Sequence, residues 1–325
     1  MSSRVLFVVA LGCFACGSNS SSGTDAGSTG VGCLPAGLAV PAGSLPTYVV
    51  SSVTLPDSGT QFAFDLNRDG TPENEFGTIL QELSGQGFSP QADVSASISS
   101  GSSILLITQN SSDPTCGAAT VQPGLATASP DFSGKGSFSA DPSFTAFGLT
   151  GPVQGGVFTG AERVPSTTTP LTVKLAFFGN TIVLPLVDPQ ITYSISSSGL
   201  SNGVINGAIL TKDLEVFYIS IAAGLNAQIA ADPSSAGSKS ELQIFDTGGA
   251  SDPACGAACK NPDTTCAVHN DGRIDPCEVS TNSVIKGIFA PDVQLFSGTA
   301  FAPGKGAADS LSIGFGFTAV SATVH

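Results

Sequence analysis

Between residues 118 and 211 the chain is a succession of short apolar runs separated by turn residues. The runs include LTVKLAFF, TIVLPLV and ITYSIS, and glycine, proline or serine separates them. Short runs rich in β-branched and aromatic residues between such breakers are typical of β-strands. No helical period runs through this stretch, and the 39 glycines, absent tryptophan and 11% charged residues also favour strands and turns. We therefore expect residues 118–211 to build the sheet-forming part of the core.

The flanking segments add helices and further strands. Apolar residues at helical spacing predict a helix from Phe76 that Gly85 ends, and Ser89-Pro90 begins a second helix that stops at Gly101. We also expect strands at 48–55, 102–108 and 310–324, and helices at 213–232 and 278–289. Together these patterns predict an α+β fold with a mostly antiparallel β core, a few short helices and disulfide staples.

The N-terminus is typical of a bacterial lipoprotein signal. Arg4 is followed by an apolar stretch at 5–15, which is too short to span a bilayer of about 30 Å. Lipidation is expected at Cys16, with Cys13 as the alternative, so residues 1–16 would form the signal peptide and 17–44 a flexible tether. The rest, 45–325, is expected to form one domain, with possible units at 45–117, 118–211 and 212–325.

Cysteine counting favours Cys16, because its use for lipid leaves an even set of six. In the oxidising compartment that a signal peptide implies, we expect disulfides and not a zinc site, since the paired C-x2-C spacing is absent. Without lipidation the protein would be extracellular. The cysteines expected to form disulfides are Cys33, Cys116, Cys255, Cys259, Cys266 and Cys277.

Charge and motif content exclude several functions. A net charge of −14 argues against a nucleic-acid partner, whose phosphates need clustered Lys and Arg. G-x-S-x-G occurs around Ser201, but the surrounding pattern predicts turn and strand instead of the strand–turn–helix of a serine hydrolase. No phosphate-binding loop or H-E-x-x-H motif occurs. The sequence therefore gives no catalytic residues.

The segment DLNRDGTPE, 65–73, places oxygen-bearing side chains at alternate positions before a glycine turn. Calcium takes six to eight oxygen ligands, and EF-hand loops supply them at positions 1, 3, 5, 7 and 9. Position 12 is Phe76, so the acid of a full EF-hand must come from Glu73 or from Asp57 or Asp93. The alternative is an Asp/Asn/Gly turn that bonds only its own backbone. The expected ligands are Asp65, Asn67, Asp69, the carbonyl of Thr71, and Glu73.

A second, weaker loop lies in HNDGRIDPCE. It lacks the first two ligands, which Asp246 could replace, and Asp275 with Glu278 also matches a helix-capping box. The expected ligands here are Asp271, the carbonyl of Arg273, Asp275 and Glu278. In the first loop, Asn74 is expected to cap the helix that follows.

The run from Tyr48 through DLNRDGTPENEFG, with NDGRIDPCEVSTNSVIKGIFAPDV and DSLSIGFGFTAV, resembles a group of uncharacterised Gram-negative lipoproteins that carry EF-hand-like loops. The resemblance implies calcium binding and a surface location, and it implies no reaction. Gly17 after Cys16 favours the outer membrane. We expect a lipid-anchored envelope protein with structural calcium. The alternatives are an adhesin or glycan-binding module with an envelope protein or glycan partner, which the absence of Trp disfavours, and a serine hydrolase.

Overall fold

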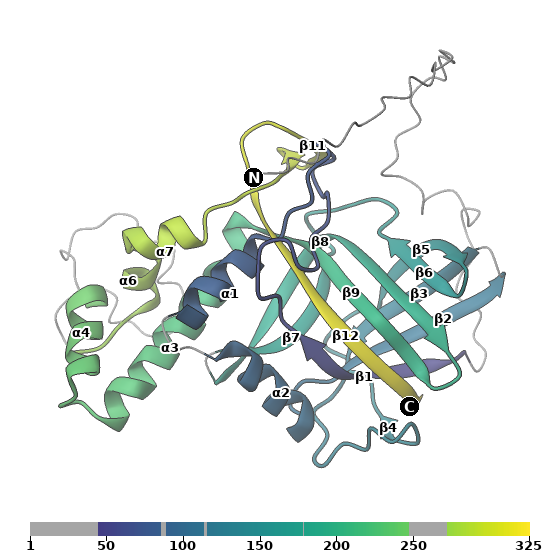
Figure 1. Ribbon diagram of the computed structural model, residues 1–325, viewed down its shortest axis with the longest axis horizontal. Coiled ribbons are helices and arrows are strands. Elements are labelled where there is room, and N and C mark those ends of the chain that lie inside the picture. The colour runs from purple at the N-terminus through teal and green to yellow at the C-terminus, as the bar shows by residue number, and fades with distance from the viewer. Residues whose placement is uncertain (1–44, 86–88, 114–115, 178, 247–271) are drawn as a thin grey trace, which may run out of the picture.

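Eight antiparallel strands close into a ring in the computed structural model, which describes residues 45–85, 89–113, 116–177, 179–246 and 272–325 (Figure 1). The neighbours follow the order β1-β2-β3-β5-β6-β8-β9-β12, and β12 pairs back to β1. The strands are β1 (Thr47–Thr54), β2 (Leu105–Asp113), β3 (Cys116–Pro123), β5 (Phe147–Gln154), β6 (Val157–Ala161), β8 (Asn180–Ser196), β9 (Gly199–Leu210) and β12 (Ser310–Val324).

Two further strands extend the sheet. β4 (Ser137–Phe138) pairs in parallel with the end of β12, and β7 (Leu171–Phe177) pairs with the first part of β8. β8 changes partner along its length, because its first part faces β7 and its second part faces β6. Asp188 lies between these two parts with a left-handed φ of 46°, where the register with β9 also shifts. The ten-stranded sheet is therefore mixed.

The expected α+β class is wrong. The protein is mostly β, with 42% strand and 25% helix, and its large sheet is mixed because β4 is parallel. β8, β9 and β12 run for 17, 12 and 15 residues, and long paired strands allow a twisted sheet to close on itself. Once the sheet closes, it provides most of the core, and the helices pack around it.

The expected disulfide staples are not found within the described ranges. No disulfide joins two residues of the described ranges. Cys277 is fully buried and disulfide-bonded, and it is the only one of the six cysteines whose side chain is described. Within the described part of the chain, sheet hydrogen bonds and apolar packing hold the fold.

Aromatic side chains belong to the main apolar core, to which every strand of the ring contributes. Phe158 and Tyr193 are fully buried with ring centroids 5.2 Å apart, and Phe317 meets Tyr193 at 6.2 Å. The Tyr193 hydroxyl donates a hydrogen bond to the side chain of Gln109, so the buried hydroxyl has a partner. Strands from all three expected units, 45–117, 118–211 and 212–325, contribute to this one core.

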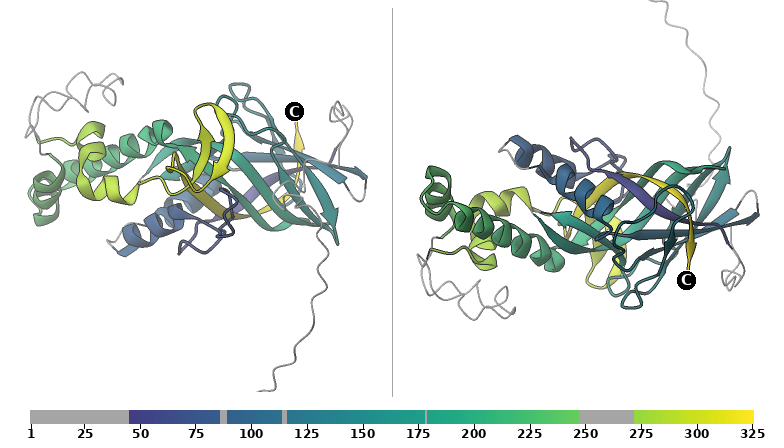
Figure 2. Two further views of the ribbon diagram at one scale, coloured as in Figure 1. Left: turned by 90° about the horizontal axis from the view of Figure 1, so that it is seen from above. Right: turned by 90° about the horizontal axis from the view of Figure 1, so that it is seen from below.

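Two helices follow the prediction closely. α1 (Glu75–Gly85) and α2 (Pro90–Ser100) have the expected bounds, and Gly101 ends α2 in the left-handed conformation, φ 77°. α3 (Glu215–Ala231) also matches its predicted helix. α2 packs against β1 and β7. The helices α3, α4 (Ala236–Phe245), α6 (Pro276–Thr281) and α7 (Ser283–Ile288) extend from one end of the ring (Figure 2).

The helix predicted at 278–289 is instead two short helices. α6 (Pro276–Thr281) ends at Asn282, whose ψ of 127° is not helical, and α7 (Ser283–Ile288) starts immediately after it. The apolar residues keep their helical spacing across Asn282, so the sequence pattern does not indicate that the helix is interrupted there. The sequence also did not predict α4 or the hairpin of β10 (Gln294–Ser297) and β11 (Ala300–Gly304).

One helix among the described residues, Thr211–Ala231, is long and apolar enough to cross a membrane by length and composition. Its side chains Phe217, Ile221 and Leu225 are buried in the main core. Core helices of soluble proteins meet the same criterion of length and composition.

A second apolar cluster covers the outer face of β8 and β9. Val187 and Leu210 from these strands pack with Leu66 from the 65–73 segment and with Leu295 and Phe296 from β10. Val187 and Leu210 lie outside the main core cluster, so the hairpin and the 65–73 loop cover the sheet from outside. This packing places the loop against the sheet, and Figure 1 shows the hairpin nearby.

Candidate metal centre

The 65–73 loop is closed at its base by a short β-bridge. The N–H of Glu73 donates to the carbonyl of Phe64 at 2.9 Å, and the N–H of Phe64 donates back at 3.2 Å. Leu66 is 1% exposed and anchors the loop in the outer apolar cluster. The bridge therefore brings both ends of the oxygen-rich segment together.

Side chains inside the loop bind its own backbone. The Asp65 carboxylate accepts from the N–H groups of Asp69 and Gly70, both at 2.9 Å, and Asn67 Oδ1 accepts from Asp69 at 3.0 Å. Asp69 in turn accepts from the N–H of Thr71 at 2.9 Å. Gly70 has a φ of 91°, a left-handed conformation that glycine adopts without a steric penalty. These bonds are the ones that the metal-free turn predicts, and they also preform a tight loop.

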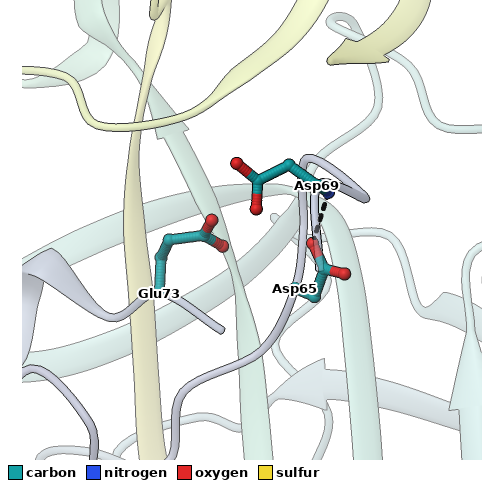
Figure 3. Close-up of side chains that lie close together, drawn as sticks. All are labelled: Asp65, Asp69 and Glu73. Carbon is teal, nitrogen blue, oxygen red and sulfur yellow. Dashed lines mark hydrogen bonds between the residues drawn. The ribbon is translucent and has the colours of Figure 1, made fainter. Parts of the chain in front are cut away.

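Glu73 distinguishes the loop from a simple turn. Ligand oxygens of Asp65, Asp69 and Glu73 all lie within 4.8 Å of one another, and Figure 3 shows the carboxylates of Asp69 and Glu73 facing the same space. This half-buried acidic triad could hold a metal ion. Among the described residues it is the one such group. Of the acids expected to replace the one missing at position 12, Glu73 is the one that lies with Asp65 and Asp69 in this group.

The environment of Glu73 disfavours its charge. Burial, together with the negative charges of Asp69 and Asp65, raises the pKa of Glu73 to about 7, although the Leu66 N–H opposes the rise. Its Oε2 atom is buried and has no hydrogen-bond partner. A buried carboxylate oxygen without a donor is unusual, so this atom needs either a proton or a cation.

Asp69 has a different environment. Hydrogen bonding from Thr71 holds the pKa of Asp69 below its usual range, and the charge of Lys305 adds to the effect. The Lys305 ammonium lies 3.6 Å from Asp69 Oδ2 but is 73% exposed. Lys305 follows the β10–β11 hairpin, so no local motif in the loop sequence indicated it.

The other residues predicted for the first loop lie outside the acidic triad. Asn67 is 7% exposed and turned into the loop, whereas the Thr71 side chain is exposed, which leaves its expected carbonyl role unaffected. Asp93 accepts a hydrogen bond from Gly179 N–H at 3.1 Å, in another part of the fold.

Asn74 does not cap α1 as predicted. Its amide is 2% exposed and bonds to Gly314 of β12, which is far away in sequence. The first N–H of α1, on Glu75, donates instead to Ser312 Oγ at 2.8 Å, and Ser312 bonds the Asp292 carboxylate. A residue on β12 therefore does the capping that the sequence assigned to a neighbour.

The second predicted loop is described only in part, because Asp271 lies outside the described residues. Asp275 and Glu278 form the capping box of α6, with reciprocal hydrogen bonds of 2.9 and 3.0 Å. Asp246 does approach, since it accepts from Gly272 N–H at 2.9 Å. The exposed Arg273 precedes Ile274, whose backbone pairs with Asn226 of α3. Metal binding here stays a prediction.

The remaining expected sites are the serine of the G-x-S-x-G motif and the cysteines. Ser201 lies within β9, opposite Ser194 of β8, so no helix follows it as a nucleophile elbow requires. The structure does not describe the cysteines Cys13, Cys16, Cys33, Cys255, Cys259 and Cys266.

In comparisons with known proteins, no family model, no curated protein and no solved structure matches this chain.

Proposed function

We propose that the protein is a cell-envelope lipoprotein whose 65–73 loop binds a structural calcium ion. The observation that carries the proposal is the convergence of Asp65, Asp69 and Glu73 within 4.8 Å around a buried, unpartnered Glu73 oxygen. The chain's own ligands are all oxygen, which suits a hard cation and disfavours zinc, which prefers nitrogen and sulfur. No catalytic step is part of the proposal.

Calcium is the ion that the spacing favours. The loop has carboxylates at positions 1, 5 and 9, an amide at 3, glycine at 6 and a carbonyl at 7, which matches the order in an EF-hand through position 9. Magnesium demands octahedral geometry and keeps several waters, so it makes less use of such a dense set of protein oxygens. The three carboxylates would repel one another without a counter-ion, and the ion would remove that repulsion.

The ion would act as a clip between distant parts of the chain. The loop contacts the outer face of β8 and β9 through Leu66, and the next residue after Glu73 bonds to β12. Fixing Glu73 on the ion would therefore hold the loop, the start of α1 and the sheet in one arrangement. Binding to the folded state only would raise stability by mass action.

The location is part of the same proposal. The N-terminal pattern favours lipidation at Cys16 and retention at the outer membrane, where millimolar external calcium would be available to a weak site of this kind. Lipidation would be measured by mass spectrometry of the membrane fraction after Cys16→Ala, with Cys13→Ala as the matched control.

Calcium binding is tested by calorimetric titration of chelator-treated full chain. We expect a saturable heat and a higher melting temperature in calcium, and both effects should be lost in Asp65→Ala/Asp69→Ala. A control with Asp57→Ala/Asp93→Ala, which removes the same charge outside the loop, should bind as the wild type does. If neither heat nor a melting shift is seen for the wild type, the proposal is wrong.

A further inference from the structure

Asn206 is a buried polar side chain without a partner, located on the sheet beneath the 65–73 loop. It is 2% exposed, and neither Oδ1 nor Nδ2 has a hydrogen-bond partner. Buried amides in proteins nearly always bond to something, so the missing partner indicates a bound group. We propose that Asn206 is a further residue of the metal centre, whose amide oxygen gives the ion a neutral ligand from β9. This inference rests on the proposed function.

Strand register places Asn206 under the loop. Asn206 on β9 pairs with Gly314 on β12, and directly paired residues present their side chains on the same face of a sheet. A β-carbon on Gly314 would lie 2.2 Å from the carbonyl oxygen of Phe62 and 3.2 Å from Asn74 Nδ2. The segment that begins before the loop and ends just after it therefore covers the face on which Asn206 lies.

Glu73 lies on the same side of the sheet. It directly precedes Asn74, whose amide bonds to the backbone of Gly314. In Figure 3 the carboxylate of Glu73 points towards the two aspartates. Its Oε2 is buried and unpartnered, as both polar atoms of Asn206 are. Two residues with unpartnered polar atoms thus lie on the side of the sheet that the loop covers.

The other amides near the loop already have partners. Asn67 Oδ1 accepts from Asp69 N–H, and Asn74 Oδ1 accepts from Gly314 N–H. Of these three asparagines, Asn206 is the one whose amide has no hydrogen-bond partner, so it would add to the amide that Asn67 supplies within the loop. Amide oxygens are common calcium ligands, and a neutral one adds coordination without adding to the repulsion among three carboxylates.

The test uses terbium as a luminescent substitute for calcium on the full chain. Lifetimes in H2O and D2O give the number of water molecules on the bound ion. In Asn206→Leu we expect one more bound water than in the wild type and an affinity lower by about tenfold. In Asn206→Asp we expect the wild-type water number and tighter binding. A residue with a merely structural role would leave the water number unchanged.

Ser103→Ala is the matched control, because Ser103 is also buried with an unpartnered side-chain oxygen, in a different part of the fold. It should keep both affinity and hydration. The inference is overturned if Asn206→Leu or Asn206→Asp folds and binds terbium with wild-type affinity and hydration. If the wild type binds no terbium, the proposed function is wrong, and this inference is wrong with it. If the wild type binds terbium and the Asn206 variants behave like it, only this inference is wrong.

Discussion

Asn74 and Gly314 exchange two hydrogen bonds, although 240 residues separate them in the sequence. Gly314 N–H donates to Asn74 Oδ1 and Asn74 Nδ2 donates to the Gly314 carbonyl, each at 3.0 Å. The same amide donates to the Gln61 carbonyl at 2.7 Å. One side chain thus joins the residues that flank the 65–73 loop to β12, the strand that closes the ring.

Replacing Asn74 should destabilise the fold strongly. Asn74→Ala leaves buried backbone groups of Gly314 without partners, so we expect a loss of about 2–4 kcal/mol in the free energy of unfolding. Asn74→Asp retains the acceptor for Gly314 N–H but places a buried carboxylate oxygen against the carbonyls of Gly314 and Gln61, so it should cost at least as much. Urea denaturation measures both. Equal stability of wild type and Asn74→Ala would show that these bonds do not hold the loop.

Lys305 should weaken ion binding. Its ammonium lies 3.6 Å from Asp69 Oδ2 and repels an incoming cation. Because Lys305 is 73% exposed, solvent screens the effect, and Lys305→Ala should tighten calcium binding by less than about tenfold. Calorimetric titration at low salt is the measurement. Lys135→Ala, an exposed lysine outside the metal loop, is the control, and weaker binding in Lys305→Ala would contradict the assignment.

Calcium affinity should depend on pH through Glu73. The pKa of Glu73 is raised to about 7, first by burial and then by Asp69 and Asp65, so below that pH a proton occupies the oxygen that the ion needs. Affinity should therefore fall as the pH drops from about 8 to about 6, and binding should release a proton. Titrations in buffers of different ionisation enthalpy measure that release. Glu73→Gln should bind weakly and show no pH dependence in this range.

A second acidic pair should make the fold less stable at high pH. Asp188 is 5% exposed, and its backbone N–H donates to the Glu162 carboxylate. The Oε2 atom of Glu162 is buried and has no hydrogen-bond partner. Burial raises the pKa of Glu162 to about 8, with the charge of Asp188 adding to the effect, and burial raises the pKa of Asp188 to about 7. Arg68 opposes the rise at Asp188.

The direction of this pH effect on stability follows from proton uptake on folding. Between the unfolded pKa values near 4 and the folded values, the folded state binds more protons, so the free energy of unfolding should fall as the pH rises from about 5 to about 8. Glu162→Gln should flatten this decline. Thermal melts between pH 5 and pH 8 measure this decline in stability, and saturating calcium suppresses the titration of Glu73 during the measurement. A stability that rises over this pH range would refute the role of Glu162 and Asp188.

Local hydrogen bonding explains what could be predicted from the sequence. The Asp65–Gly70 turn and the ends of α2 depend on residues a few positions apart, and such short-range bonds appear directly in residue order. The same holds for the alternating strands, whose side-chain period is set by the backbone. The three carboxylates of the metal centre were named from spacing alone.

Long-range pairing explains the rest. Alternation is the same in an open sheet and in a closed ring, so no residue pattern showed that β1 and β12 would pair. Nothing in its strand distinguishes Asn206, which draws attention only because it pairs with Gly314 on the face that the loop covers. Asn74 looked like a local cap, but the polar groups of a strand 240 residues away satisfied it better. The chain order specified the acidic 65–73 loop, whereas contacts between distant segments decided which face of the sheet the loop covers.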